Sequence, residues 1–83
     1  MKGVIRKIGN RMPILTYPIA KDEQLEIFGF ITENGDSYAI VRSNNQWRNL
    51  LVRYNGHDEP YISTNAGGKR IRVYLSDCRR CLQ

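Results

Sequence analysis

The sequence predicts a mainly β protein, built as a small, strongly bent antiparallel sheet or barrel of about five to six strands, SH3-like or OB-like, with at most a short C-terminal helical turn. Three observations favour this class. Short segments rich in β-branched and aromatic residues alternate apolar and polar side chains. Turn-forming residues separate these segments about every eight to twelve residues. The chain has 83 residues, which predicts a single β-rich domain over residues 1–83 with a small core.

Two candidate strands lie near the start of the chain. Residues 2–8, KGVIRKI, alternate loosely and contain β-branched residues, which predicts a strand. Residues 13–20, PILTYPIA, are apolar but carry Pro13 and Pro18. Because proline cannot donate a hydrogen bond to a neighbouring strand, we expect this segment to be an edge strand or an extended loop.

The clearest local pattern is a β-hairpin over residues 25–43. Asn34-Gly35 separates two alternating segments, and this dipeptide accepts the positive φ angles of a type I′ turn. The first segment, residues 25–31, is apolar on both faces, so we expect it to be a central strand that is covered on both sides. Gly29 within it marks a bend or a close approach of another backbone.

The second half of the chain begins with an ambiguous segment. Residues 47–54, WRNLLVRY, fit both helical and strand spacing, but the segment is short and contains Val, Trp and Tyr, which favours a strand. Residues 61–64, YIST, predict a further short strand. Gly67-Gly68 then predicts a turn, because glycine adopts positive φ without steric cost.

The last predicted strand covers residues 69–75, KRIRVYL. Its isoleucine, valine and leucine fall on one face, and its arginines and tyrosine fall on the other. Ser76 is then a candidate N-cap for a single helical turn that contains Cys78 and Cys81.

The positive charge is concentrated at both ends of the sequence. The formal net charge is +5, from 13 basic and 8 acidic residues. Residues 1–20 hold four basic residues and no acidic residue, residues 21–60 hold four basic and seven acidic residues, and residues 61–83 hold five basic residues and one acidic residue. We expect the first and last strands to be neighbours, as in many small barrels, so that the two basic ends form one surface.

The composition also favours a cytoplasmic protein with no membrane partner. No apolar run approaches the roughly 20 residues that a membrane span requires. The first twenty residues have basic side chains but no continuous apolar stretch and no small-residue cleavage site, so we expect no signal peptide. Only two cysteines are present, which excludes a disulfide-rich secreted scaffold.

The two cysteines leave three interpretations open. Cys78 and Cys81 have the spacing of half a zinc site, and His57 with Asp58 are the candidates to complete it, although nothing in their spacing requires this. A redox pair needs a depressed thiol pKa, which a capped helical turn and neighbouring arginines favour. The third interpretation is that one cysteine packs and the other is loose. We expect the third, and therefore no metal and no cofactor.

The sequence offers little for catalysis. His57 is the single histidine, no serine lies in a nucleophile motif, and no carboxylates show a telling spacing. Residues 65–70, NAGGKR, lack the spacing, the hydroxyl residue and the following helix of a phosphate-binding loop. We therefore expect a protein that is not an enzyme.

Basic and aromatic residues carry the functional hypothesis. The candidate binding residues are Lys69, Arg70, Arg72, Tyr74, Arg42, Arg53, Trp47, Tyr54, Tyr61, Arg6 and Lys7. One reading is a non-catalytic module, an adaptor or an inhibitor, that engages a protein partner through residue types that dominate interfaces. The alternative is a small β-barrel that binds single-stranded DNA or RNA by phosphate contacts and base stacking. Size and composition also suit a phage or mobile-element protein.

Overall fold

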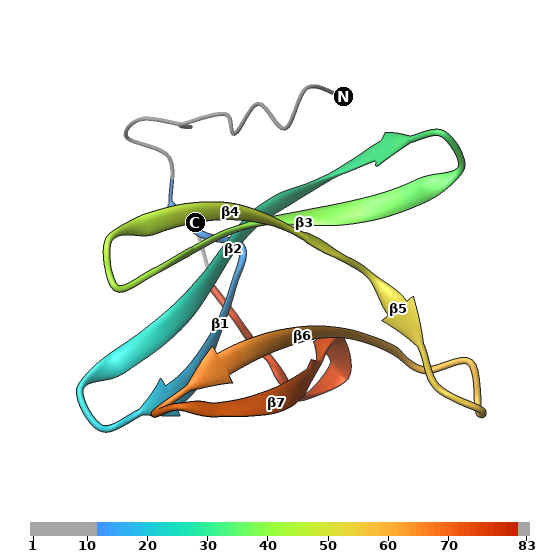
Figure 1. Ribbon diagram of the computed structural model, residues 1–83. Helices are drawn as coiled ribbons and strands as arrows, with labels where there is room; N and C mark the ends of the chain where they lie inside the picture. Colours follow the sequence, from blue (N-terminus) through green and yellow to red (C-terminus); the bar gives the residue numbers. More distant parts are fainter. Residues whose placement is uncertain (1–11, 82–83) are drawn as a thin grey trace.

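The structure is a computed structural model, and it describes residues 12–81, which form antiparallel strands in two sheets (Figure 1). The elements are β1 (Leu15–Ala20), β2 (Glu23–Glu33), β3 (Asp36–Ser43), β4 (Gln46–Leu51), β5 (Arg53–Tyr54), β6 (Pro60–Ala66), β7 (Lys69–Tyr74), the 3-10 helix η1 (Leu75–Asp77) and β8 (Arg79–Arg80). The mainly β class and the antiparallel pairing are therefore confirmed.

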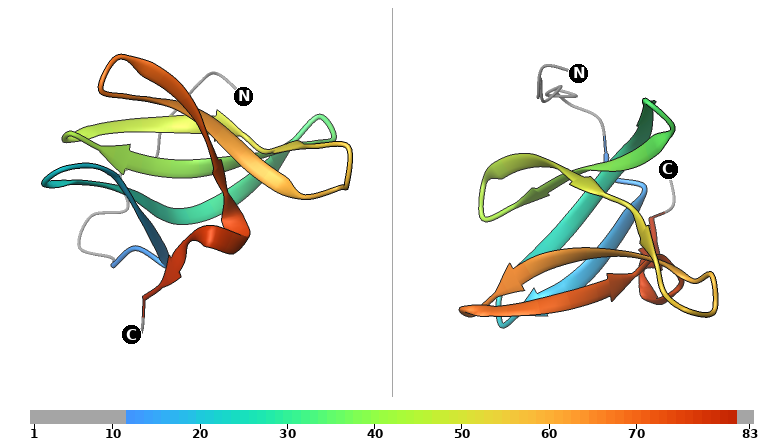
Figure 2. Two further views of the ribbon diagram at one scale, coloured as in Figure 1. Left: turned by 90° about the horizontal axis from the view of Figure 1, so that it is seen from below. Right: turned by 45° about the vertical axis from the view of Figure 1, so that its right-hand side comes forward.

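The predicted strand number and the closed barrel are wrong. Within residues 12–81 there are eight strands, arranged as a five-stranded sheet in the order β4-β3-β2-β1-β8 and a three-stranded sheet in the order β5-β6-β7. The chain passes from one sheet to the other between β4 and β5, at Val52, where the backbone amide donates to the Ser37 carbonyl (2.8 Å). On the other side of the molecule β7 and β1 do not pair, so the barrel is not closed (Figure 2).

Three tight turns explain why consecutive strands pair. Both central residues have positive φ in the turn after β2 (Asn34 and Gly35, 53° and 84°) and in the turn after β6 (Gly67 and Gly68, 59° and 83°). The turn after β3 repeats this pattern with two asparagines, at 52° and 62°. These are the angles that type I′ turns require, and their twist matches that of the flanking strands. The predicted hairpin is confirmed.

Strand β2 is central, as predicted, and its cover changes along its length. Leu25 and Ile27 are fully buried on one face, and Phe28 is 6% exposed. The register with β3 shifts between Ile27 and Gly29, which is the bend that Gly29 indicated. Beyond this bulge Phe30 is 43% exposed, so the prediction of cover on both sides holds only for the first half of the strand.

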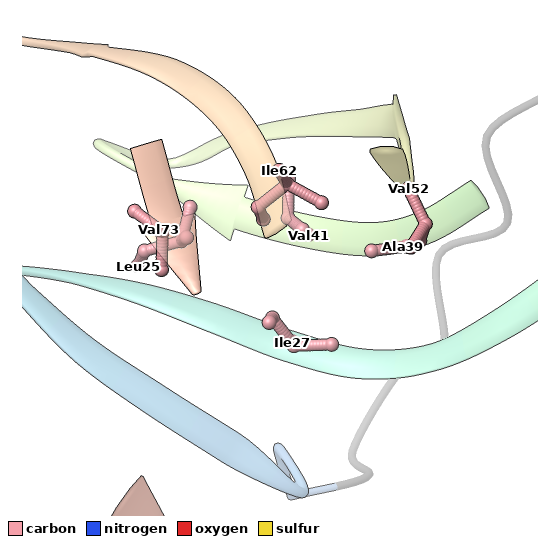
Figure 3. Packing of buried hydrophobic residues seen from close by; sticks show 7 residues of the cluster. All are labelled: Leu25, Ile27, Ala39, Val41, Val52, Ile62 and Val73. Atoms are coloured by element: carbon pink, nitrogen blue, oxygen red, sulfur yellow. The ribbon is translucent and has the colours of Figure 1, made fainter. Parts of the chain in front are cut away.

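The core lies between the two sheets (Figure 3). It consists of Leu25, Ile27, Ala39, Val41, Val52, Ile62 and Val73. The first four come from the five-stranded sheet and the last two from the three-stranded sheet, with Val52 between them. Burying an isoleucine, leucine or valine contributes about 1.5–3 kcal/mol, so this cluster is the main force that holds one sheet on the other.

The first and last described strands, β1 and β8, are neighbours, but they are not the strands that the sequence predicted as first and last. Of the predicted pair, residues 2–8 lie outside the described residues, and β7 does not pair with β1. Leu15 and Thr16 of β1 pair with the two arginines of β8, and the Cys81 amide donates to the Ile14 carbonyl (3.0 Å). The segment with two prolines therefore forms a strand, and Pro18 lies where β1 pairs with β2 alone. The strand predicted for residues 2–8, with Arg6 and Lys7, lies outside the described residues.

The C-terminal segment differs from the expected capped helical turn. Helix η1 ends before the cysteine pair, and its N-cap is Tyr74, with no side-chain cap hydrogen bond. Ser76 lies inside this helix and does not cap it. Cys78 is extended, with φ −79° and ψ 146°. The segments 47–54, 61–64 and 69–75 do lie in strands, as predicted, apart from Val52 and Leu75. Within residues 12–81, no helix has the length and apolar character needed to cross a membrane.

Candidate partner-binding face

The outward face of the three-stranded sheet gathers five of the candidate residues. Arg53 on β5 lies opposite Tyr61 on β6, which lies opposite Tyr74 on β7. Arg72 and Arg70 follow on the same face of β7, because side chains two residues apart on a strand point the same way. We call these five residues the arginine–tyrosine face.

The centre of this face is a stack of one guanidinium group on two rings. The Arg72 guanidinium carbon lies 4.4 Å from the centroid of the Tyr61 ring. The Tyr61 and Tyr74 rings are 5.3 Å apart at an angle of 48°. This geometry is that of a cation–π contact beside a tilted aromatic pair. As a result Tyr61 is only 7% exposed although it lies on an outward face.

Asn55, which the sequence analysis did not single out, organises the loop beside the face. Its side-chain oxygen accepts hydrogen bonds from the backbone amides of His57 (2.8 Å) and Glu59 (3.0 Å). Its amide nitrogen donates to the Glu59 carboxylate (2.8 Å) and to the Tyr74 hydroxyl (3.4 Å). An asparagine that starts an Asn-Gly loop is typical of this kind of turn, so a signal was present.

Hydrogen bonds at the Tyr74 hydroxyl shift two pKa values. Arg72 Nη1 donates to this hydroxyl (3.4 Å), and this bond lowers the pKa of Tyr74, with the bond from Asn55 acting in the same direction. The same hydrogen bond is the main reason that the pKa of Arg72 is raised above its ordinary value. Arg72 therefore stays positively charged at every physiological pH.

The three arginines of this face have no carboxylate partner among residues 12–81. Arg70 donates to the Ser63 hydroxyl (3.4 Å), and Arg72 contacts the two tyrosines. Arg53 is exposed on the short strand β5. In that part of the chain Arg42 forms an ion pair with Glu26 on the other sheet. The face thus carries three arginines that form no ion pair with a described carboxylate, and the Glu59 carboxylate lies beside its edge, where Asn55 links it to Tyr74.

Arg42 and Trp47 do not extend this face. Arg42 Nη2 lies 2.7 Å from Glu26 Oε1, and its guanidinium carbon lies 5.3 Å from the Phe28 ring and 5.4 Å from the Trp47 ring. Trp47 in turn contacts Phe28, with centroids 4.8 Å apart. Arg42, Glu26, Phe28 and Trp47 all belong to the five-stranded sheet. They point to the face of that sheet that lies away from the core residues Leu25, Ile27 and Val41. The structure therefore places them on a different sheet from the arginine–tyrosine face.

The remaining candidates have separate positions. Lys69 is exposed at the start of β7, next to the hairpin turn. Tyr54 is 60% exposed at the end of β5, and it follows Arg53 on the opposite side of the strand. Arg6 and Lys7 lie outside the described residues.

The cysteines are free, and they do not meet. The Cys78 thiol donates to the Tyr74 carbonyl (3.6 Å), and burial raises its pKa, with Asp77 adding to this effect. Cys81 lies three residues further along an extended segment, which spans roughly 10 Å. That separation is too long for a shared disulfide or metal ion without rearrangement. Among residues 12–81, no group of three or more His, Cys, Asp or Glu side chains is placed to hold a metal ion.

The geometry defines a small two-sheet antiparallel β protein with a basic, tyrosine-containing face on its smaller sheet. Comparisons with protein-family models, with curated proteins and with solved structures find no significant match.

Proposed function

We propose that this protein is a non-catalytic binding module that engages an acidic surface of a partner protein through its arginine–tyrosine face. The observation that carries the proposal is the set of three arginines, Arg53, Arg70 and Arg72, on one strand face without a carboxylate partner among the described residues. Guanidinium groups recognise carboxylates through paired N–H donors, and arginine and tyrosine are the residue types that dominate binding energy at protein interfaces.

The covered rings of Tyr61 and Trp47 favour a protein partner over single-stranded nucleic acid, and of the candidate aromatic residues Tyr54 alone is more than half exposed. Binding by base stacking requires an exposed aromatic plane. Tyr61 is 7% exposed because Arg72 lies over its ring, and Trp47 is in contact with Phe28 and Arg42. Guanidinium groups on one strand face, of which Arg72 is held over the Tyr61 ring, suit carboxylates, which need no ring to stack on.

The experiment compares two polyanions of similar length at several salt concentrations. The probes are fluorescent poly-L-glutamate and oligo-thymidine, each of about 20 units, titrated with protein and followed by anisotropy. We expect poly-L-glutamate to bind more tightly. We expect the double variant Arg70→Ala, Arg72→Ala to weaken this binding by about three- to tenfold, because each exposed charge pair contributes about 0.2–1 kcal/mol.

The matched control is the double variant Arg79→Ala, Arg80→Ala, which removes the same number of charges from exposed positions on β8 of the other sheet. We expect it to leave poly-L-glutamate binding within about twofold of the original, since only weak long-range electrostatics change. Tighter binding of oligo-thymidine, or equal losses in the control and in the variant Arg70→Ala, Arg72→Ala, contradicts the proposed function.

A further inference from the structure

One edge of the arginine–tyrosine face ends in an unpaired strand. All six residues of β7 pair with β6 on one side. On its other side, no strand of residues 12–81 pairs with β7, and no described backbone–backbone hydrogen bond reaches it; the Tyr74 carbonyl at its end accepts a hydrogen bond from the Cys78 thiol. Strand β1 is similarly open over most of its length, because β8 pairs with only Leu15 and Thr16. Since β4 continues into β5, β7 and β1 are the margins of the open side of the molecule (Figure 1).

The two faces of β7 specify the chemistry of a strand that would add to this edge. On the outward face stand Arg70 and Arg72, and on the inward face stand Ile71, which is half-buried, and Val73, which is fully buried. Tyr17 and Ile19 of β1 are also partly buried against the same core. Directly opposite residues on paired strands share a face. An added strand therefore places every second side chain beside the arginines and the others toward apolar groups.

Charge argues against the two occupants that this chain itself offers. A second copy that pairs β7 with β7 brings arginines onto one face beside arginines, and like charges at opposite positions destabilise a sheet. Residues 2–8, the strand expected from the sequence, carry Lys2, Arg6 and Lys7 and no acidic residue. A strand with acidic residues at alternate positions meets the arginines with opposite charge.

We propose that the free edge of β7 accepts an extended segment of a partner protein, in which apolar and acidic residues alternate, as an additional antiparallel or parallel strand. The inference rests on the proposed function and specifies how the acidic partner is held. Strand addition is a general mode of recognition, in which backbone hydrogen bonds supply affinity and alternate side chains supply specificity. Here the acidic side chains lie beside Arg70 and Arg72, and the apolar ones lie toward Ile71.

The test uses an eight-residue peptide, (Val-Glu)4, with blocked ends and a fluorescent label, and two N-methylated forms of it. In an extended peptide all valine amides point to one edge and all glutamate amides point to the other. One form is methylated on the valine amides and the other on the glutamate amides. Because only one edge of the peptide meets β7, we expect one form to lose about tenfold or more in affinity and the other to stay within about threefold of the parent.

A charge-reversal variant supplies the second readout. With Arg72→Glu, we expect the preference to change from (Val-Glu)4 to (Val-Lys)4, whereas Arg48→Glu on β4 leaves the original preference. Circular dichroism of each variant establishes that it is folded. Loss of (Val-Glu)4 binding without any gain of (Val-Lys)4 binding by folded Arg72→Glu contradicts the proposed pairing beside β7.

The outcomes separate this inference from the proposed function. If poly-L-glutamate binds but the two methylated peptides behave alike, whether both bind or neither binds, strand addition is overturned and the proposed function stands. If poly-L-glutamate and (Val-Glu)4 both fail to bind at low salt, the proposed function itself fails. If sedimentation of the protein alone shows a dimer that (Val-Glu)4 cannot dissociate, a second copy occupies the edge and the proposed partner does not.

Discussion

Arg72 is the residue that joins the parts of the candidate face. Its guanidinium group lies over the Tyr61 ring and donates to the Tyr74 hydroxyl, so one side chain covers one ring and polarises the other. These contacts hold a long, flexible side chain in one place before any partner arrives. A side chain that is already ordered loses less conformational entropy on binding.

The first prediction concerns the pKa of Tyr74. Because hydrogen bonds from Arg72 and Asn55 favour the ionised phenol, the pKa of Tyr74 lies below the ordinary value of 10. We expect Arg72→Ala to move it upward. The measurement is a pH titration of the Tyr74 ring resonances by NMR. Arg70→Ala is the control, because Arg70 contacts Ser63 and not Tyr74, and an equal upward movement in this variant would contradict the assignment.

At this scale the sequence predicted which residues share a strand face, but not what they touch. The alternation of residues 69–75 correctly placed Arg70, Arg72 and Tyr74 together. It could not show that Trp47 and Arg42 face away on the other sheet, because that depends on where the chain crosses between sheets. It also could not show that Tyr61 is covered, since this results from a contact across strands.

At the scale of elements, hairpin turns fix the register of the arginines. The turn at Gly67 and Gly68 sets Arg72 opposite Ser63 and Arg70 opposite Asn65. A register slip of one residue would turn every side chain of β7 to the opposite face. The positive φ angles of this turn therefore determine which side of the sheet is basic.

The second prediction tests this turn. Gly68 has a φ of 83°, and an added Cβ there meets no atom within 4 Å, so the cost of Gly68→Ala is one of backbone conformation. We expect a loss of about 1–2 kcal/mol in the free energy of unfolding, measured by urea denaturation. Gly56→Ala is the matched control, since its surroundings are equally open and its φ is not in the left-handed region.

For Gly56→Ala we expect no loss, or a gain of up to about 1 kcal/mol, because alanine restricts the unfolded chain. Equal changes in the free energy of unfolding for the two substitutions would show that the positive φ at Gly68 is not the cause of the stability loss.

Elements set by neighbouring residues were predictable, and elements set by distant contacts were not. The Asn34-Gly35 turn and the alternation of residues 69–75 are local signals, and both were confirmed. Strand β8 forms because its two residues pair with β1, more than sixty positions earlier in the sequence, and no local sequence pattern predicts it. Its extended form also displaced the helical turn that was expected around Cys78.

At the scale of the whole molecule, the described body is close to neutral. Residues 12–81 hold nine basic and eight acidic residues, and four of the thirteen basic residues precede them. The basic character of the candidate face is therefore a matter of placement. Since the net charge of +5 comes mostly from residues 1–11, the described residues select an acidic partner by short-range contacts more than by their net charge.

The third prediction concerns the cooperativity of the two sheets. Ile62, on the smaller sheet, is fully buried against Ile27 and Val41 of the larger one. We expect Ile62→Val to lower the free energy of unfolding by about 1 kcal/mol. The urea midpoint of unfolding should fall by the same amount whether it is followed by the fluorescence of Trp47, which lies on the larger sheet, or by far-ultraviolet circular dichroism. Two separate transitions, or a Trp47 transition that does not move, would show that the sheets unfold independently.

The hydrogen bond between Ile14 and Cys81, together with the pairing of β1 and β8, connects the two ends of the described chain. This connection consists of a two-residue strand and one further backbone hydrogen bond, so it is the shortest strand pairing in the larger sheet. Local unfolding that begins at either terminus breaks the pairing of β1 with β8, and it exposes the edge of β1 that β8 had covered. Mechanical force, proteolysis or a bulky fusion at one terminus is therefore expected to disturb this pairing, which includes residues near the other terminus.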